Sequence, residues 1–200
     1  TSYGIHVAQT LANDLASEEK VLVSGGAYGI DGAVHSAALA SGGHTVAVLA
    51  GGLDRPYPVG HRELLERIGD LGLLVSELPP GETPTRGRFL ARARIEAALS
   101  GSTTIVEAAS RSGALPVAHW AHELGRVVGA VPGPVTSATS YGTHQLLQIG
   151  AASLVTDASD LMYLVDQAQV PATTRRMERD QLSTGQERHA PTTSTSSRSM

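Results

Sequence analysis

Residues 21–40 read VLVSGGAYGIDGAVHSAALA and contain a short apolar run, a glycine-rich turn and a helical pattern in direct succession. The run at 21–23 consists of Val and Leu, which favour a buried strand. The turn at 24–29 carries Gly25, Gly26 and Gly29, and apolar residues then recur at helical spacing through 30–40. A continuous apolar strand that leads through glycines into a helix is typical of a parallel α/β unit.

The same alternation of strand and helix runs through residues 1–166. The helical pattern is expected at residues 4–16, 30–40, 60–69, 88–99, 114–124 and 142–149. Short apolar runs typical of strands lie at residues 21–23, 45–49, 73–75, 103–106, 127–131 and 152–155. Right-handed crossovers between such strands give a doubly wound, mostly parallel, Rossmann-like α/β sheet with helices on both faces. The chain opens on a helix, so we expect either a shorter sheet or a missing first strand.

Composition separates this domain from the end of the chain. The protein has 200 residues, 41% of them hydrophobic, and no cysteine, which excludes disulfides and thiolate chemistry. No apolar run is long enough to span a bilayer and no signal-like start is present, so we expect a cytoplasmic protein. Residues 171–200 hold 11 Ser or Thr, and we expect a domain over 1–166 and a disordered Ser/Thr-rich tail over 167–200.

Loops with unusual composition follow the expected strands. They lie at residues 24–32, 51–58, 76–81, 107–113 and 132–134. In doubly wound sheets such loops converge at the carboxyl ends of the strands, where glycines let backbone N–H groups approach a phosphate. Glycines also form tight turns with no ligand, and this alternative stays open. A dinucleotide site fits poorly because Gly51 and Gly52 stand where a ribose-binding acid is wanted, and a P-loop is absent.

The segment 83–95 is rich in arginine. It contains Arg86, Arg88, Arg92 and Arg94 and no acidic residue, although residues 1–170 hold 16 acidic and 10 basic side chains. Cations at a helix start oppose the helix dipole, so an anion bound between them and the backbone would relieve repulsion. We expect a cationic patch beside the glycine loops, where a ring such as Phe89 stacks on a base. A solvated basic face is the alternative. His119 and His122 are expected on a helix surface.

Successive motifs resemble one family in order and spacing. They are the residues 24–31, Gly52 with Tyr57 and Pro58, and the stretches 76–81, 86–100, 107–115, 130–133, 141–142 and 150–151. Together they resemble the DNA-processing protein A (DprA/Smf) family, and the residue choices are similar to those of members from actinobacteria. The resemblance covers most of residues 4–165.

The resemblance implies a fold and a function. Members have a Rossmann-like core that binds single-stranded DNA, dimerises, and helps to load a RecA-type recombinase during natural transformation, the competence-linked uptake of DNA. The family is not regarded as enzymatic, and no cofactor is implied. The DNA-binding residues would be Gly25, Gly26, Tyr28, Gly29, Arg55, Arg86, Arg88, Phe89, Arg92, Arg94, Ser112 and Gly113.

The chain also departs from the family pattern. Ala93 stands where the arginine-asparagine-arginine run has its asparagine, Pro116-Val117 replaces a polar pair, and the first strand with its Gly-Ser-Arg loop is absent. The tail stands where many members have a winged-helix domain. We expect Arg94→Ala to weaken DNA binding and Ala93→Asn to strengthen it.

Two alternatives from other classes stay open. One is a nucleotide-binding enzyme or sensor of the related lysine-decarboxylase-like phosphoribohydrolase group, in which Glu77 or Glu107 would be a carboxylate base. That group's Gly-Thr-x-x-Glu element is missing from residues 107–113. The other is a scaffold for dimerisation that binds no DNA, in which neither substitution would have an effect.

Overall fold

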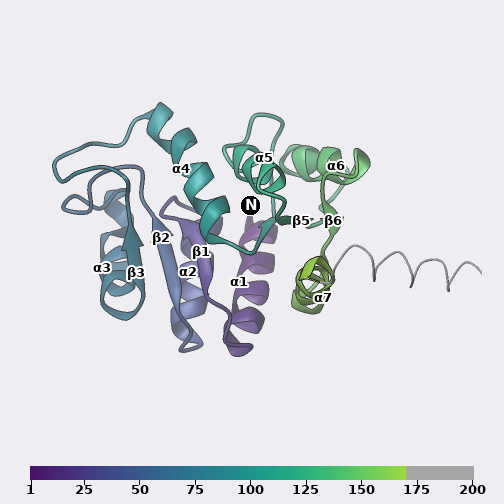
Figure 1. The fold of residues 1–200 in the computed structure, drawn as a ribbon, viewed down its shortest axis with the longest axis horizontal. Helices are drawn as coiled ribbons and strands as arrows, with labels where there is room; N and C mark the ends of the chain where they lie inside the picture. The colour runs from purple at the N-terminus through teal and green to yellow at the C-terminus, as the bar shows by residue number, and fades with distance from the viewer. Residues whose placement is uncertain (170–200) are drawn as a thin grey trace, which may run out of the picture. The chain divides into compact units, whose positions relative to one another are not determined.

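A computed structural model describes residues 1–169 (Figure 1). Residues Thr1–Val165 form one compact unit. Of the remaining residues, only the end of the last helix, α7 (Ala158–Gln169), is described. The expected Ser/Thr-rich tail lies outside the described residues from residue 170 onward. No helix within the described part is both long and apolar enough to cross a membrane.

Six short strands form two parallel sheets. They are β1 (Leu22–Gly25), β2 (Thr45–Val48), β3 (Leu73–Val75), β4 (Ser102–Ile105), β5 (Val127–Ala130) and β6 (Ser153–Leu154). One sheet has the order β1-β2-β3 and the other β4-β5-β6. Every pairing is parallel, which confirms the expected strand direction. The strands form two three-stranded sheets rather than one, because β1 pairs only with β2 and β4 only with β5 within residues 1–169.

Helices connect the strands in alternation. They are α1 (Ser2–Ser17), α2 (Ile30–Ala40), α3 (Arg62–Leu71), α4 (Arg86–Leu99), α5 (Leu115–Glu123), α6 (Tyr141–Gln148) and α7, with 3₁₀ turns η1 (Val59–His61) and η2 (Ala138–Ser140). The first six helices confirm the expected pattern to within a few residues. The seventh was not expected from the sequence, and α4 begins two residues earlier than its apolar pattern predicts.

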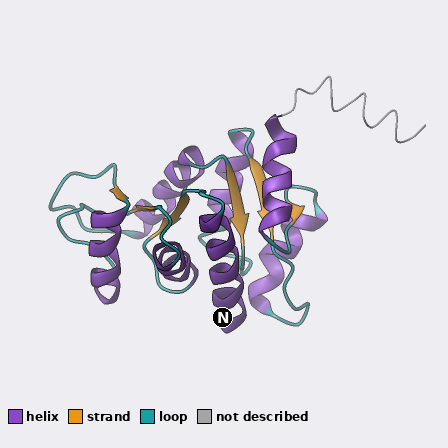
Figure 2. Ribbon diagram, turned by 90° about the horizontal axis from the view of Figure 1, so that it is seen from below, coloured by secondary structure: helices purple, strands orange, loops and turns teal. Residues whose placement is uncertain are grey.

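The helices cover both sides of the strands (Figure 2). Helix α2 follows β1 and α3 precedes β3, and α1, α2 and α3 pack in sequence against one another. Helix α4 carries the chain from β3 to β4 and lies against β1, β2 and α5. The chain thus runs from β1 to β3, returns along α4 past β2 and β1, and then forms β4, β5 and β6. This change of direction is the doubly wound arrangement, in which ligands bind at the carboxyl ends of the strands. The sequence-based fold class is therefore confirmed.

Three apolar clusters hold the unit together. The first joins α1 and α2 to Val106, Val131 and Val155, which directly follow β4, β5 and β6. The second packs α4, α5, β4 and β5 around buried alanines and Ile105. The third joins β2, α2 and α3 through Leu65 and Ile68, both fully buried. These clusters pack around the ends of the strands and so fix the positions at which the following loops begin.

Candidate functional site

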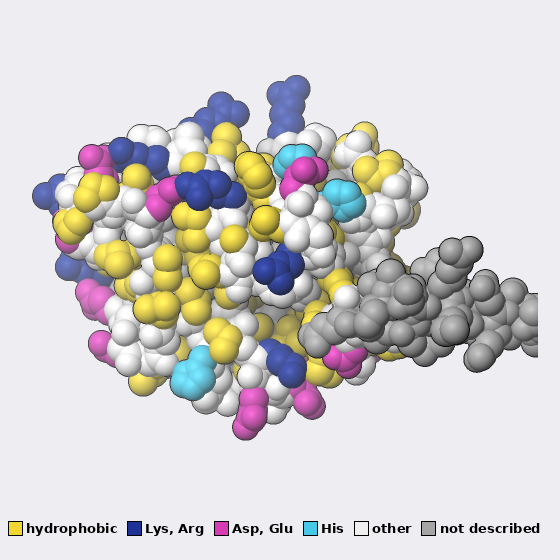
Figure 3. Space-filling model, in the orientation of Figure 1, with side chains coloured by type: hydrophobic (Ala, Val, Ile, Leu, Met, Phe, Trp, Pro, Cys, Tyr) yellow, Lys and Arg dark blue, Asp and Glu magenta, His cyan; other side chains and the backbone are white. Residues whose placement is uncertain are grey.

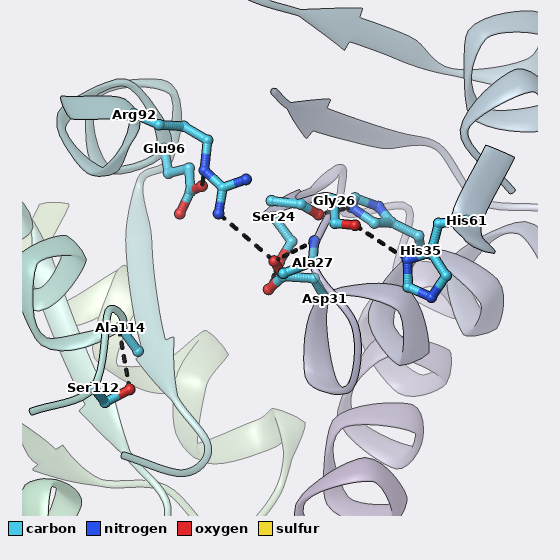
Figure 4. Close-up of polar contacts among 11 residues, drawn as sticks. Ser24, Gly26, Ala27, Asp31, His35, His61, Arg92, Glu96, Ser112 and Ala114 are labelled. Carbon is cyan, nitrogen blue, oxygen red and sulfur yellow. Dashed lines mark hydrogen bonds and ion pairs between the residues drawn. The ribbon is translucent and has the colours of Figure 1, made fainter. Parts of the chain in front are cut away.

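The glycine-rich loop after β1 is closed by a carboxylate of the following helix. The Ser24 hydroxyl donates to Asp31 Oδ1 at 2.9 Å, and the Ala27 N–H donates to Asp31 Oδ2 at 3.0 Å (Figure 4). Gly29 has φ of 89°, which a residue with a side chain rarely adopts. The Ala27 N–H of this loop is thus bonded by the protein itself.

Arg92 of α4 reaches this loop from the other side. Its Nη2 lies 3.8 Å from Asp31 Oδ2 and its Nε lies 2.7 Å from Glu96 Oε1 (Figure 4). The guanidinium carbon lies 5.3 Å from the centre of the Phe89 ring, a cation–π distance. The arginine side chain is only 12% exposed. A cation is therefore held between the glycine loop and an aromatic ring, as the sequence predicted for this region.

Gly25 leaves the space that Arg92 occupies. A Cβ atom at Gly25 would overlap the Arg92 guanidinium and lie 2.6 Å from Asp31 Oδ2. We therefore expect Gly25→Ala to push Arg92 away from the loop and to lower the free energy of unfolding by about 1–3 kcal/mol, as overpacking does. Chemical denaturation measures this loss. Gly113→Ala is the control, since a Cβ there meets nothing within 4 Å; equal stability of both variants would contradict the packing argument.

Glu96 is the most perturbed carboxyl of the site. Burial raises its pKa to about 7, and Asp31 adds to the increase while Arg92 opposes it. Arg92 Nε and Glu96 Oε1 are close, but they are not aligned as a hydrogen bond, and neither atom has another hydrogen-bond partner in the part of the chain that the structure describes. The ion pair therefore compensates only part of the desolvation of Glu96.

A buried histidine of α2, His35, holds the end of β1, where the glycine-rich loop begins. His35 Nδ1 lies 2.7 Å from Thr45 Oγ1, and its Nε2 lies 2.7 Å from the Gly25 carbonyl. Burial lowers the pKa of His35, although its bond to the Gly25 carbonyl acts in the opposite direction. A neutral imidazole thus fixes the end of β1.

Aromatic side chains form the outer edge of the site. Tyr57 and Phe89 lie edge to face with ring centres 6.1 Å apart, and Tyr28 contacts His61 at 4.7 Å. The Tyr28 hydroxyl accepts the Gly60 N–H, and the His61 ring bonds through Nδ1 to the Gly26 carbonyl. Tyr28 and Tyr57 remain 64% and 48% exposed. These two rings are therefore available to stack on a planar ligand.

The other arginines of α4 are mostly paired with acids from outside the segment. Arg88 contacts Glu82 at 2.5 Å and Arg94 pairs with Glu77. Outside α4, the predicted contact Arg55 lies 3.7 Å from Asp54. Arg86 is exposed and has no ion pair within residues 1–169. Basic side chains extend along the upper edge of one face, where Figure 1 places α4, with acidic side chains beside them (Figure 3).

These pairs correct the interpretation of an unpaired cationic patch. The segment 83–95 contains no acid, but Asp31, Glu77, Glu82 and Glu96 approach its arginines. The sequence-based interpretation missed the role of Asp31 and of Glu96. The i,i+4 spacing of Arg92 and Glu96 on one helix was the available signal, whereas the approach of Asp31 to Arg92 depends on α4 lying against β1, the strand whose loop leads into α2.

Two predicted residues lie on a different loop. Ser112 accepts the Ala114 N–H at 3.2 Å, a local turn, and Gly113 is exposed (Figure 4). No hydrogen bond or ion pair in the described part joins either residue to Arg92 or Asp31. At the start of this loop, Glu107 accepts hydrogen bonds from Thr1 and Thr139. Burial raises the pKa of Glu107, but these bonds and the nearby amine outweigh burial and leave the pKa lowered.

Ala93 is buried, with only 2% exposed. Its side chain belongs to the packed face of α4, between the largely buried Arg92 and the more exposed Arg94. An asparagine amide here would be buried in helix packing. Burial of that amide costs stability unless it is hydrogen-bonded, and the stronger DNA binding expected for Ala93→Asn stays a prediction.

The fold and the site together define a class: a doubly wound α/β protein in which arginines of α4, a glycine-rich loop and exposed rings lie together after the strands. Comparison with known proteins makes this more specific. The sequence profile of the DNA recombination-mediator protein A family matches residues 1–166. The chain belongs to this family.

Individual relatives agree with this assignment. A DNA processing protein DprA of Mycobacterium tuberculosis is 58% identical over 165 residues, which cover 82% of this chain and 42% of the relative. The X-ray structure of DprA from Streptococcus pneumoniae superposes with a TM-score of 0.76 at 41% identity, covering 82% of this chain and 57% of that one. DprA from Helicobacter pylori, described for its single-stranded DNA binding mode, superposes with a TM-score of 0.75 at 30% identity, covering 84% and 75%. The chain thus spans about half the length of its curated relatives.

Proposed function

We propose that this chain binds single-stranded DNA through the surface formed by α4 and the loops after β1 and β2. Phosphates contact Arg86, Arg88, Arg92 and Arg94, and bases stack on Tyr28, Tyr57 and Phe89. Gly29, where a Cβ atom would meet nothing within 4 Å in the described part of the chain, lets the strand approach the backbone, and Gly25 and Gly26 are further predicted contacts. Arg55, Ser112 and Gly113 extend this surface as further predicted contacts.

One observation carries the proposal: a cationic helix and exposed aromatic rings lie side by side at the glycine loop. Arg92 contacts Phe89, Phe89 contacts Tyr57, and Gly25 lies directly under Arg92. Arginines neutralise phosphates, while rings need unpaired bases, which only a single strand exposes. The Helicobacter pylori relative binds single-stranded DNA, which supports the same ligand class here.

The wider role follows from the family. We infer a non-enzymatic protein that works in the cytoplasm, as a homodimer, in DNA uptake during natural transformation and in homologous recombination. It would protect single-stranded DNA and load a RecA-type recombinase. The domain over residues 1–166 would carry DNA binding, with the segment 167–200 as a tail. The loading step is tested by mixing purified recombinase and this chain with single-stranded DNA and measuring how much recombinase binds the strand.

Fluorescence anisotropy of a labelled oligo-dT tests the DNA proposal. We expect the single strand to bind more tightly than a duplex of the same length, and its affinity to fall steeply between about 50 and 200 mM salt as counterions are released. Thymidine monophosphate is added as a competitor of the labelled strand, because a nucleotide-binding enzyme would bind the monophosphate. Equal binding of duplex and single strand, or tighter binding of the monophosphate, would contradict the proposal.

Arg86→Ala gives the cleanest test of a phosphate contact. Because Arg86 is exposed and has no ion pair in the described residues, its loss should leave the melting temperature unchanged. We expect weaker binding and a salt slope that is shallower by about 0.7 for one lost phosphate contact on a single strand. Arg67→Ala is the matched control, since Arg67 is an exposed arginine on α3. An equal effect of the two variants would show that only net charge matters.

A further inference from the structure

Two glutamates in the segment 76–85, between β3 and α4, hold the exposed arginines of the proposed DNA surface. Glu77 pairs with Arg94, and Glu82 pairs with Arg88 at 2.5 Å. The side chains of both pairs are between 31% and 48% exposed, whereas Arg92 and Glu96 are each 12% exposed. The outer pairs are therefore open to solvent and to a competing anion.

These glutamate side chains have no second partner. Within residues 1–169, the Glu77 carboxylate is bonded only by Arg94, and the Glu82 carboxylate is paired only with Arg88. The backbone of Glu82 does hold the loop, because its carbonyl accepts the Gly52 N–H at 2.8 Å. A glutamine at either position keeps the backbone and the side-chain shape, so the charge can be removed separately from the fold.

The pairing has a consequence for ligand binding. Exposed ion pairs contribute little to stability, so these carboxylates are easily displaced. Each one nevertheless competes with a phosphate for its arginine at the high effective concentration of an intramolecular group. A strand that contacts both arginines must displace both carboxylates, which lowers its affinity.

We propose that Glu77 and Glu82 are internal competitors for phosphate that weaken the binding of single-stranded DNA and so keep it reversible. This inference rests on the proposed function. The two carboxylates cover the outer arginines until a strand replaces them, while Arg92 stays fixed at the glycine loop.

Removing the charges tests the proposal in the full chain. In low salt we expect the double variant E77Q/E82Q to bind labelled oligo-dT between about twofold and thirtyfold more tightly than the parent, the range for two exposed pairs. E66Q is the matched control, because Glu66 forms an exposed pair with Arg62 at 3.0 Å on α3. It removes the same charge far from α4 in the chain and should change affinity by less than about twofold.

A double-mutant cycle separates pairing from general repulsion of DNA. The gain from E77Q should vanish when Arg94 is replaced by alanine, and the gain from E82Q should vanish with Arg88→Ala. If Arg94→Ala prevents DNA binding even in low salt, the effect of E77Q cannot be measured in that variant, and the Glu82–Arg88 cycle alone tests the inference. The inference is overturned if E77Q or E82Q still tightens DNA binding when its partner arginine is alanine, or if neither variant binds more tightly than E66Q. Either result leaves the proposed function standing. Absence of oligo-dT binding by the parent and by every variant overturns the proposed function and this inference together.

Discussion

Arg92→Ala is expected to destabilise the protein by about 3–5 kcal/mol at pH 8, because removal of one partner leaves a buried charge uncompensated. Glu96 is 12% exposed and loses the one ion-pair partner it has within residues 1–169, and Asp31 loses its contact at 3.8 Å. At pH 5 the effect should be smaller, since Glu96 is then protonated and carries no charge. Oligo-dT binding should also fall, because the cation beside Gly25 and Phe89 is gone. Urea denaturation at both pH values measures the first effect.

A second substitution separates stability from binding. Arg92→Ala combined with Glu96→Gln removes both charges of the pair, so stability at pH 8 should recover in part. DNA binding should not recover, because the glutamine restores no cation. Recovery of binding in the double variant would show that Arg92 acts only on the fold. Equal destabilisation at pH 5 and pH 8 would show that the charge on Glu96 is not the cause.

Stability of the parent protein should carry a component that falls as the pH rises. The pKa of Glu96 lies at about 7 in the folded state, above the ordinary value of 4.5. The folded state therefore binds more protons than the unfolded state between these values. The stabilising contribution is complete below about pH 4.5 and is lost as the pH rises through 7. One pKa unit corresponds to about 1.4 kcal/mol, so the full change is on the order of 3 kcal/mol.

His35 has the opposite effect and must be separated from Glu96. Its lowered pKa means that the unfolded state binds the extra proton, so this contribution is lost as the pH falls below 6.5. The difference between the parent and Glu96→Gln isolates the carboxyl, because His35 is common to both. We expect Glu96→Gln to gain stability relative to the parent from pH 5 to pH 8. A difference that stays constant over this range would rule out titration of Glu96.

The order of elements was readable from the sequence because it depends on local periodicity. The apolar runs at β1–β6 and the helical pattern of α1–α6 were predicted to within a few residues. Helix α7 was not expected; its apolar residues Ala158 and Leu161 join the first apolar cluster, which residues of α1, α2 and the ends of β4, β5 and β6 complete. The motifs at residues 24–31 and 76–115 were sufficient to indicate the family.

Charge at the site was decided only by tertiary structure. The sequence places Arg86, Arg88, Arg92 and Arg94 in a segment without acids, which determines a cationic helix. Asp31 comes from α2, and it reaches Arg92 only because α4 lies against β1. Glu77 and Glu82 lie in the loop just before α4, and the fold of that loop decides which arginine each of them pairs with. The burial that raises the pKa of Glu96 likewise arises when α4 packs on the sheet. Ion pairing depends on distance in space, and the sequence by itself determines distance only along the chain.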